Sequence, residues 1–315
     1  MTDDVAAGTD LSLERIELAA RVIDPVFRDT PQYIDEQLCA ALGRQVIVKV
    51  ETANPIRSFK GRGTDYLIGQ LEPGRHPVCV STGNFGQGVA YAARRRSLPA
   101  TVFTPTGTSP SKLDRIRALG AEVISIDSDP RAAAAEFVAH SPSRLLVKDG
   151  GDPRIAEGAA TIAVELFSTY RPDTLVVPVG DGALITGIAR WAKAVAPTTR
   201  IIGICAAGAP AMLHSWHART PRQAPATTIA EGLAITTPIP ESLNRMLPLI
   251  DDLLEIPDAP LLDAMRLAAR TLGLLLEPSG AVGLAALTTL PIPGTTVATI
   301  LTGSNLRTEH LHHLN

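Results

Sequence analysis

Residues 78–104 read VCVSTGNFGQGVAYAARRRSLPATVFT, and this stretch decides the fold class. It opens with a short run rich in β-branched residues, Val78–Ser81, and closes with a second such run, Thr101–Thr104. Between them, Gln87–Arg96 is alanine-rich and long enough for a helix. A strand, a helix and a second strand in this order predict a βαβ unit, whose two strands lie parallel in one sheet.

The same alternation continues in both directions along the chain. Further strands are predicted at Val46–Val50, Glu122–Ile126, Leu145–Lys148, Leu175–Val179, Ile201–Cys205 and Val297–Leu301. Helices are predicted at Lys112–Leu119, Ile155–Tyr170, Leu184–Ala194 and Leu261–Leu275. The pattern therefore indicates an α/β fold with a largely parallel sheet covered on both faces, and the units between residues 75 and 146 can form a compact sub-sheet.

Composition excludes several classes of protein. The 315 residues carry a formal net charge of −3 with both signs interspersed, which argues against a nucleic-acid or anionic-membrane partner. The three cysteines, at positions 39, 79 and 205, are too far apart for a disulfide framework or a zinc site. No secretory signal and no apolar run of membrane-spanning length is visible, so we expect a cytoplasmic protein.

The segment NPIRSFKGRG, residues 54–63, carries the first candidate for chemistry. Lys60 follows the aromatic Phe59 and precedes a glycine, so its amine can be pressed against a flat aromatic ligand. A partly desolvated lysine loses its proton readily and can form an imine with an aldehyde. The competing interpretation is a solvated lysine in a polar loop.

A second candidate, Ser81–Gln87, lies between the predicted strand and helix of the opening stretch. Unpaired backbone amides at a helix N-terminus bind anions such as carboxylates. Gly83 and Gly86 permit close approach of a ligand, while Thr82 and Asn84 add a hydroxyl and an amide. The competing interpretation is an ordinary capped turn.

Two more segments follow predicted strands. Residues 180–184, GDGAL, form a glycine-containing turn before a helix and can cradle a small phosphate, although neither nucleotide-binding spacing is present. The Asp181 carboxylate would repel a phosphate, so we expect it to point away or to be paired. Residues 301–305, LTGSN, end the last predicted strand. Ligands of open α/β sheets collect at the carboxyl ends of strands, and all the candidate segments lie at or beside such ends.

With these segments in place, the chain resembles the fold-type II family of pyridoxal-phosphate enzymes, in its serine/threonine dehydratase (ammonia-lyase) branch. The resemblance rests on Thr30-Pro31, Glu51–Gly63, Ser81–Gly88, Glu157-Gly158, Glu231-Gly232, Glu277–Gly280 and Thr302–Asn305. It implies two open, mostly parallel twisted sheets with helices on both faces. It also implies a large cofactor domain (residues 1–74 and 147–315) into which a small mobile domain (residues 75–146) is inserted.

The resemblance assigns roles to single residues. Lys60 resembles the lysine that binds the aldehyde of pyridoxal 5'-phosphate, and Phe59 the residue beside the cofactor ring. Asn84 resembles the asparagine that hydrogen-bonds the phenolic oxygen, and Thr302 the hydroxyl that contacts the pyridine nitrogen. Thr82 matches a catalytic hydroxyl opposite the lysine. The loop that grips the substrate carboxylate is implied to be Ser81, Thr82, Gly83, Asn84 and Phe85. The phosphate cradle is implied to be Gly180, Asp181, Gly182, Ala183 and Leu184.

The implied reaction is β-elimination from L-threonine, L-serine or a related hydroxy amino acid, giving a 2-oxo acid and ammonia. The chain departs from the family pattern at Asp181 and Ala183, where many relatives have glycines, and at Phe85, which replaces a common histidine. Residues 206–212 contain no acid, so no metal site is expected. A β-replacement synthase of the cysteine-synthase kind and a threonine synthase are alternatives, but Gly61 occupies the place of their usual aspartate. A non-catalytic binding protein is a further alternative, and a homodimer is expected by resemblance.

Overall fold

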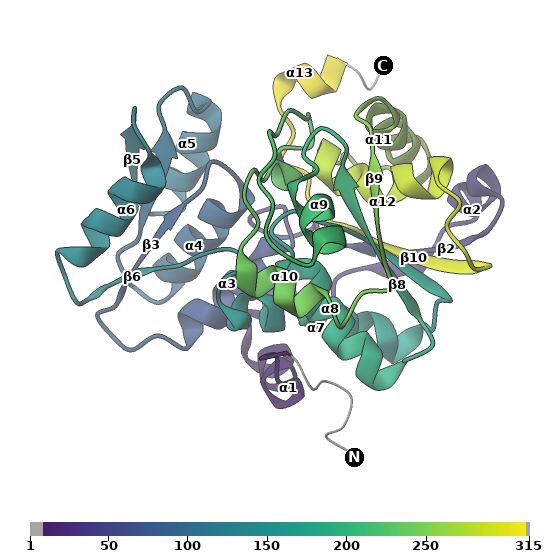
Figure 1. The fold of residues 1–315 in the computed structure, drawn as a ribbon, viewed down its shortest axis with the longest axis horizontal. Coiled ribbons are helices and arrows are strands. Elements are labelled where there is room, and N and C mark those ends of the chain that lie inside the picture. Colours follow the sequence, from purple (N-terminus) through teal and green to yellow (C-terminus); the bar gives the residue numbers. More distant parts are fainter. Residues whose placement is uncertain (1–8, 313–315) are drawn as a thin grey trace.

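The computed structural model describes residues 9–312, whose strands form two separate sheets (Figure 1). The larger sheet has six strands in the order β1-β2-β10-β7-β8-β9, and the smaller has four in the order β5-β4-β3-β6. The larger sheet comprises β1 (Gln32–Ile34), β2 (Gln45–Val50), β7 (Thr174–Pro178), β8 (Arg200–Ala206), β9 (Asp252–Ile256) and β10 (Thr296–Leu301). The smaller comprises β3 (His76–Val80), β4 (Thr101–Pro105), β5 (Glu122–Ile126) and β6 (Arg144–Leu146).

Strand pairing confirms the predicted fold class. Every paired set of neighbours is parallel except β1 and β2, which are antiparallel. All eight predicted strands are present, with ends shifted by no more than two residues. The sequence pattern does not predict β1 and β9. Both are edge strands of the larger sheet, so neither carries the continuous apolar run of a strand buried on both faces.

Helices flank both sheets (Figure 1). The first part of the chain contributes α1 (Leu13–Val22), η1 (Pro25–Phe27), α2 (Glu36–Leu42), α3 (Lys60–Gly69), α4 (Asn84–Arg95), α5 (Pro110–Ala118), α6 (Pro130–Ala139) and α7 (Pro153–Thr169). The second contributes α8 (Ala183–Val195), α9 (Ala211–Ala218), η2 (Glu231–Leu233), α10 (Pro240–Met246), α11 (Ala259–Leu272), α12 (Pro278–Thr289) and α13 (Thr308–Leu311). None of the described helices is long and apolar enough to cross a bilayer.

The larger sheet separates two clusters of buried apolar side chains. In β2, Ile47 packs with α7 and α8, whereas Val46 and Val48 pack with α11 and α12 on the opposite face. Successive side chains of a strand point to opposite faces, so burial on both sides requires consecutive apolar residues, as in Val46-Ile47-Val48.

The chain crosses between the sheets twice. It enters the smaller sheet after α3 and returns after β6 through the loop that precedes α7. Figure 1 shows the smaller sheet with α4, α5 and α6 as one lobe beside the larger one. Independent movement of residues 75–146 stays a prediction.

Helix α5 begins at a serine–proline pair and is followed by a glycine. Ser109 occupies the N-cap position and Pro110 the first helical position, while Gly120 follows the helix with a left-handed φ of 98°. The Ser109 hydroxyl does not cap the helix, however. Its oxygen lies 2.9 Å from the Ser111 hydroxyl instead.

Candidate active site

The candidate segments converge on one cavity of about 860 Å³ between the two sheets. The volume is in the range of small-molecule and cofactor sites. All the residues assigned by resemblance line it: Phe59, Lys60, Ser81, Thr82, Gly83, Asn84, Phe85, Gly180, Asp181, Gly182, Ala183, Leu184 and Thr302. The structure therefore brings together every residue to which the resemblance assigns a role, while the roles themselves stay predictions; Gly86 does not line the cavity.

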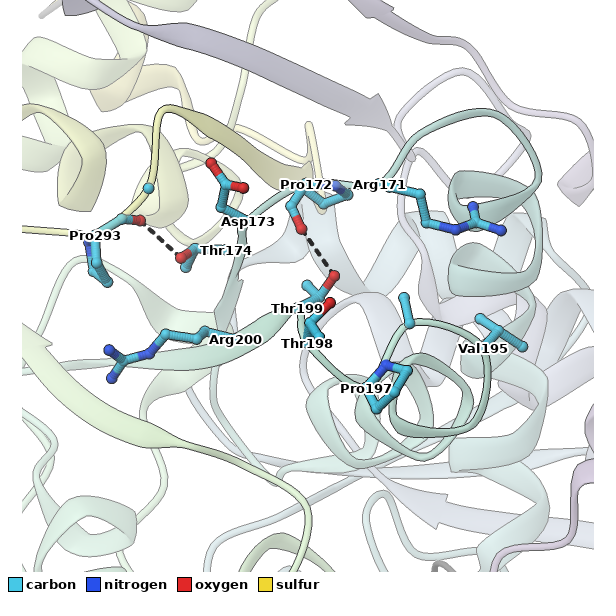
Figure 2. Close-up of a pocket in the computed structure, with 12 residues that line it drawn as sticks. Arg171, Pro172, Asp173, Thr174, Val195, Pro197, Thr198, Thr199, Arg200 and Pro293 are labelled. Atoms are coloured by element: carbon cyan, nitrogen blue, oxygen red, sulfur yellow. Dashed lines mark hydrogen bonds between the residues drawn. The ribbon is translucent and has the colours of Figure 1, made fainter. Parts of the chain in front are cut away.

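A second cavity, of about 550 Å³, lies at the opposite, amino ends of β7 and β8 (Figure 2). Its polar side chains are used to join the strand ends. The Thr174 hydroxyl donates to the Pro293 carbonyl at 2.7 Å, and the Thr199 hydroxyl to the Pro172 carbonyl at 2.8 Å. Asp173 accepts hydrogen bonds from the amides of Thr295 and Thr296. This cavity is consequently a structural junction.

Lys60 is placed by a loop that is tied to the end of β10. The Phe59 amide donates to the Thr302 carbonyl at 3.1 Å, and Ser58 forms an isolated bridge with Gly303. Asn54 shapes the loop from within, since its side-chain amide donates to the Ser58 carbonyl and its oxygen accepts from the Ser58 amide. The lysine is therefore presented at the carboxyl end of a strand, as predicted.

The Lys60 amine points into the cavity and forms an ion pair with Asp149. The amine lies 4.7 Å from the centre of the Phe59 ring and 5.9 Å from that of Phe85. The second carboxylate oxygen of Asp149 is buried and has no hydrogen-bond partner in the described part of the chain. An orphaned buried acceptor beside the reactive amine indicates that a polar ligand group belongs there.

The sequence reasoning missed Asp149. It directly follows the predicted strand Leu145–Lys148, so the strand-end rule contained the signal. Its loop is held in place by Arg245, which donates to the carbonyls of Gly150 and Gly151 at 2.9 Å each. The structure thus adds the Asp149 carboxylate, whose loop is held by Arg245, to the candidate site.

The loop before α4 offers unpaired amides to the cavity. The Ser81 hydroxyl oxygen accepts from the Gly83 amide at 3.2 Å and the Gly86 amide at 3.0 Å, which curls the loop around it. The amides of Thr82, Asn84 and Phe85 make no hydrogen bond to any residue between 9 and 312. Three free donors at the start of a helix can bind a carboxylate.

The Asn84 side chain links three segments across the cavity. Its nitrogen donates to Glu277 Oε1 at 2.7 Å, and its oxygen accepts from the Asn305 side chain at 2.6 Å. Burial raises the pKa of Glu277, although the hydrogen bond from Asn84 acts in the opposite direction. Glu277 and Asn305 lie in segments on which the family resemblance rested, but neither had been assigned a role.

The turn between β7 and α8 fits a phosphate group. Gly182 adopts a left-handed φ of 88°, which turns the chain sharply into the helix. The amides of residues 180–184 have no hydrogen-bond acceptor in the part of the chain that the structure describes. A Cβ at Gly180 would lie 2.6 Å from the Gly232 carbonyl, so only glycine leaves this cradle open. The donors and the space match the phosphate of the expected cofactor.

Asp181 can lie beside a phosphate if its carboxyl group is protonated, a state that the sequence analysis did not consider. Burial, reinforced by the negative charge of Asp149, raises the pKa of Asp181 to about 7. No hydrogen bond or ion pair engages its carboxyl group among residues 9–312, so it is not paired. Below that pKa the group is a neutral acid that can donate a hydrogen bond to a phosphate oxygen. Protonation thereby removes the repulsion that was expected of a carboxylate.

The raised pKa of Asp181 predicts a pH-dependent stability for the cofactor-free protein. The pKa rises from 3.8 in the unfolded chain to about 7 in the folded one, so the folded state retains a proton that the unfolded state has lost. The free energy of unfolding contributed by this group therefore falls between pH 4 and pH 7 and is level above pH 8. We expect Asp181→Asn to raise the urea midpoint relative to the parent by more at pH 8 than at pH 5. An equal difference at both pH values would contradict the assignment.

Comparison with known proteins agrees with this geometry. Residues 23–303 match the model of the family described as "Pyridoxal-phosphate dependent enzyme". An L-threonine ammonia-lyase from Thermotoga maritima is 31% identical over 305 residues, covering 94% of this chain and 76% of that protein. A serine racemase from Oryza sativa subsp. indica is 31% identical over 291 residues, covering 89% and 84% of the two chains.

Solved structures give the same result. The T.th. threonine deaminase superimposes with a TM-score of 0.89 at 30% identity, covering 94% of this chain and 99% of that one. Maize serine racemase superimposes with a TM-score of 0.90 at 26% identity, covering 96% of each chain. With the matched family model, the cavity between two parallel sheets and the phosphate cradle all in agreement, the chain belongs to the family of pyridoxal-phosphate-dependent enzymes.

Proposed function

We propose that this enzyme is a pyridoxal-phosphate-dependent ammonia-lyase that acts by β-elimination on L-threonine, L-serine or a related β-hydroxy amino acid. The observation that carries the proposal is the placing of the Lys60 amine in the same cavity as the free amides at the start of α4. An amino acid whose carboxylate is held by those amides lies within the cavity that the amine enters. The activities for which the threonine ammonia-lyase and threonine deaminase relatives are named support the same reaction.

Each end of the cavity would hold one part of the cofactor. The amides of residues 180–184 and the Asp181 carboxyl group would bind the phosphate, and Phe59 would flank the ring. Bound there, pyridoxal phosphate supplies the electron sink that makes the substrate Cα–H bond acidic. Thr302, 5% exposed, would face the ring nitrogen.

The remaining chemistry belongs to side chains of this protein. Lys60, as a neutral amine, would remove the Cα proton, and Asp149 would stabilise the resulting ammonium through the ion pair already present. The Thr82 hydroxyl makes no hydrogen bond within the described residues and is available to deliver a proton to the departing β-hydroxyl. The substrate loses its Cα proton and β-hydroxyl as water. One water then replaces the nitrogen, so the products are a 2-oxo acid and ammonia.

A second candidate activity is racemisation, because serine racemases are among the relatives. The nature of the group at position 302 argues for elimination. The Thr302 hydroxyl donates to the Ser279 carbonyl at 3.3 Å and is a neutral group that carries no negative charge to the ring nitrogen. A carboxylate at position 302 would stabilise a protonated ring nitrogen of the cofactor. The cofactor would then withdraw electrons from the substrate more strongly. Elimination does not need that stronger withdrawal.

Thr302→Asp is therefore expected to raise racemisation and transamination relative to elimination. The measurement is the ratio of D-serine plus transamination product to 2-oxo acid, starting from L-serine. Thr302→Ser, which keeps the hydroxyl, is the matched control and should retain the parental ratio. The same partition in Thr302→Asp and the parent would remove this argument.

The decisive test of the proposed function is a scan of amino acids for release of 2-oxo acid and ammonia. A lyase releases both from a hydroxy amino acid alone, whereas a β-replacement synthase forms a new amino acid only when a nucleophile is supplied. Failure of every hydroxy amino acid to release ammonia from the cofactor-loaded enzyme would overturn the proposal.

We further propose that the enzyme is a cytoplasmic homodimer and that residues 75–146 move as a small domain when substrate binds. The family resemblance supports the dimer and the movement. Light scattering on the purified protein tests the first, and a mass twice that of one chain is expected. Scattering profiles with and without a bound substrate analogue test the second.

A further inference from the structure

Helix α5 forms part of the cavity wall beside the loop that precedes α4. A Cβ placed on Gly86 would lie 3.2 Å from the Ser81 Cβ and 3.3 Å from Ile116 Cδ1 of α5. Arg115 precedes Ile116 and, three residues after Lys112, shares its side of the helix. Lys112 and Arg115 both line the cavity. Arg115 therefore lines the same cavity as the residues whose amides are proposed to hold the substrate carboxylate.

Arg115 differs from Lys112 and Arg307, which also line the cavity, because it has no partner among residues 9–312. Lys112 forms an ion pair with Glu231 across the cavity mouth, and Arg307 pairs with the same carboxylate. Arg115 is half-buried, and it makes no hydrogen bond or ion pair with any residue of the described range 9–312. Partial burial lowers its pKa, and the nearby positive charge of Arg57 lowers it further.

The acid that acts most on Arg115 is already engaged. Glu277 favours the charged form of Arg115 electrostatically, but its carboxyl group accepts the hydrogen bond from Asn84. Burial raises the pKa of Glu277, which reduces the negative charge that it can offer. Arg57 is exposed and likewise has no side-chain partner among the described residues. The guanidinium groups of Arg57 and Arg115 thus repel one another, and neither forms an ion pair with a carboxylate of the described residues.

An unpaired, partly desolvated guanidinium is costly unless an anion is bound there during function. The α-carboxylate of an amino acid does not need it, because the free amides of Thr82, Asn84 and Phe85 serve that group. The side chains of serine and threonine carry no charge, so neither would engage Arg115. The guanidinium fork matches a second carboxylate or a phosphate, which it can bind through two parallel hydrogen bonds.

We propose that Arg115 is a specificity residue that binds a second anionic group of the substrate, carried on the β-carbon or on its oxygen. The inference rests on the proposed β-elimination and narrows its substrate class. Two compounds carry this chemistry in different places. In 3-hydroxyaspartate the second anion is a carboxylate on the β-carbon, and in O-phosphoserine it is a phosphate that leaves in place of the hydroxyl.

The test compares kcat/KM for L-serine, L-threonine, L-threo-3-hydroxyaspartate and O-phospho-L-serine in the cofactor-loaded enzyme. We expect kcat/KM for 3-hydroxyaspartate or O-phosphoserine to be higher than kcat/KM for both L-serine and L-threonine. Arg115→Ala should lower the ratio of kcat/KM for that substrate to kcat/KM for L-serine on the order of 10- to 100-fold, mainly through KM, because a charge-assisted bond is lost. Arg115→Lys should recover part of the loss. Arg117→Ala, on the same helix but exposed and paired with Asp114, is the matched control and should leave the ratio unchanged.

The outcomes separate this inference from the proposed function. Release of 2-oxo acid from serine or threonine, with no preference for either dianionic compound, would overturn the role of Arg115 and leave the lyase assignment intact. An equal loss for neutral and dianionic substrates in Arg115→Ala would also overturn it, since that result indicates a structural role. No release from any of the four compounds would contradict the proposed function itself.

Discussion

Lys60→Ala is expected to lower kcat for 2-oxo acid release by at least about 10³-fold, within the usual range for loss of a general base or nucleophile. The Lys60 amine enters the cavity between Phe59 and Phe85 and is the proposed base and covalent anchor. The variant should still fold, because the side chain is 16% exposed and contributes one ion pair. Absorbance of the bound cofactor and steady-state kinetics, measured on the same preparation, check the expectation.

Two controls make the result specific to this amine. Lys60→Arg keeps the positive charge beside Asp149 but cannot give up its proton, so it should be as inactive as Lys60→Ala. Lys193→Ala removes a lysine at the end of α8 that pairs with Asp251, and it should retain parental activity. Turnover by Lys60→Ala at the parental rate would contradict the assignment.

Arg62→Leu is expected to reduce the free energy of unfolding by about 3 to 5 kcal/mol, because it leaves the buried Glu51 carboxylate without its ion-pair partner and Glu165 with Lys49 alone. Arg62 has no exposed surface. It donates to Glu51 at 2.7 Å, to Glu165 at 2.6 Å and to Thr161 at 2.9 Å. Burial acts to lower the pKa of Arg62, but the two acids outweigh it and raise the pKa.

Urea unfolding at neutral pH measures this loss. The exposed pair of Arg117 and Asp114 provides the comparison, and Arg117→Ala should cost less than about 1 kcal/mol. A loss of similar size in both variants would show that the buried network does not stabilise the fold. Because Arg62 belongs to α3, whose first residue is Lys60, the network also fixes the helix that carries the reactive amine.

The fold could be predicted from the sequence where a single strand or helix has a recognisable pattern of apolar residues. Strands buried on both faces, such as β7 and β8, are nearly continuous apolar runs and can be identified from their own sequence. Edge strands β1 and β9 and helix α3 lack such a pattern. The sequence of α3, KGRGTDYLIG, contains three glycines and buries an arginine and an aspartate, so its helical state depends on the network around Arg62.

The candidate site, like the fold, could be predicted from the sequence only in part. Its segments could be predicted because each follows a strand, and parallel strands deliver their carboxyl ends to a common edge. Contacts between segments could not, since the hydrogen bonds of Asn84 with Glu277 and Asn305 join residues about 200 positions apart. The raised pKa of Asp181 depends on its burial and on the nearby Asp149, which only the folded structure shows. The lack of a partner for Arg115 likewise becomes visible only once the cavity is assembled.

The most direct test of the account maps the covalent attachment of the cofactor. Borohydride makes the bond between a lysine amine and the aldehyde of pyridoxal phosphate irreversible, and digestion with mass spectrometry then identifies the modified lysine. The account predicts one modified site, Lys60, in the enzyme as purified with its cofactor. Modification of a different lysine, or retention of the cofactor with Lys60 unmodified, would contradict it.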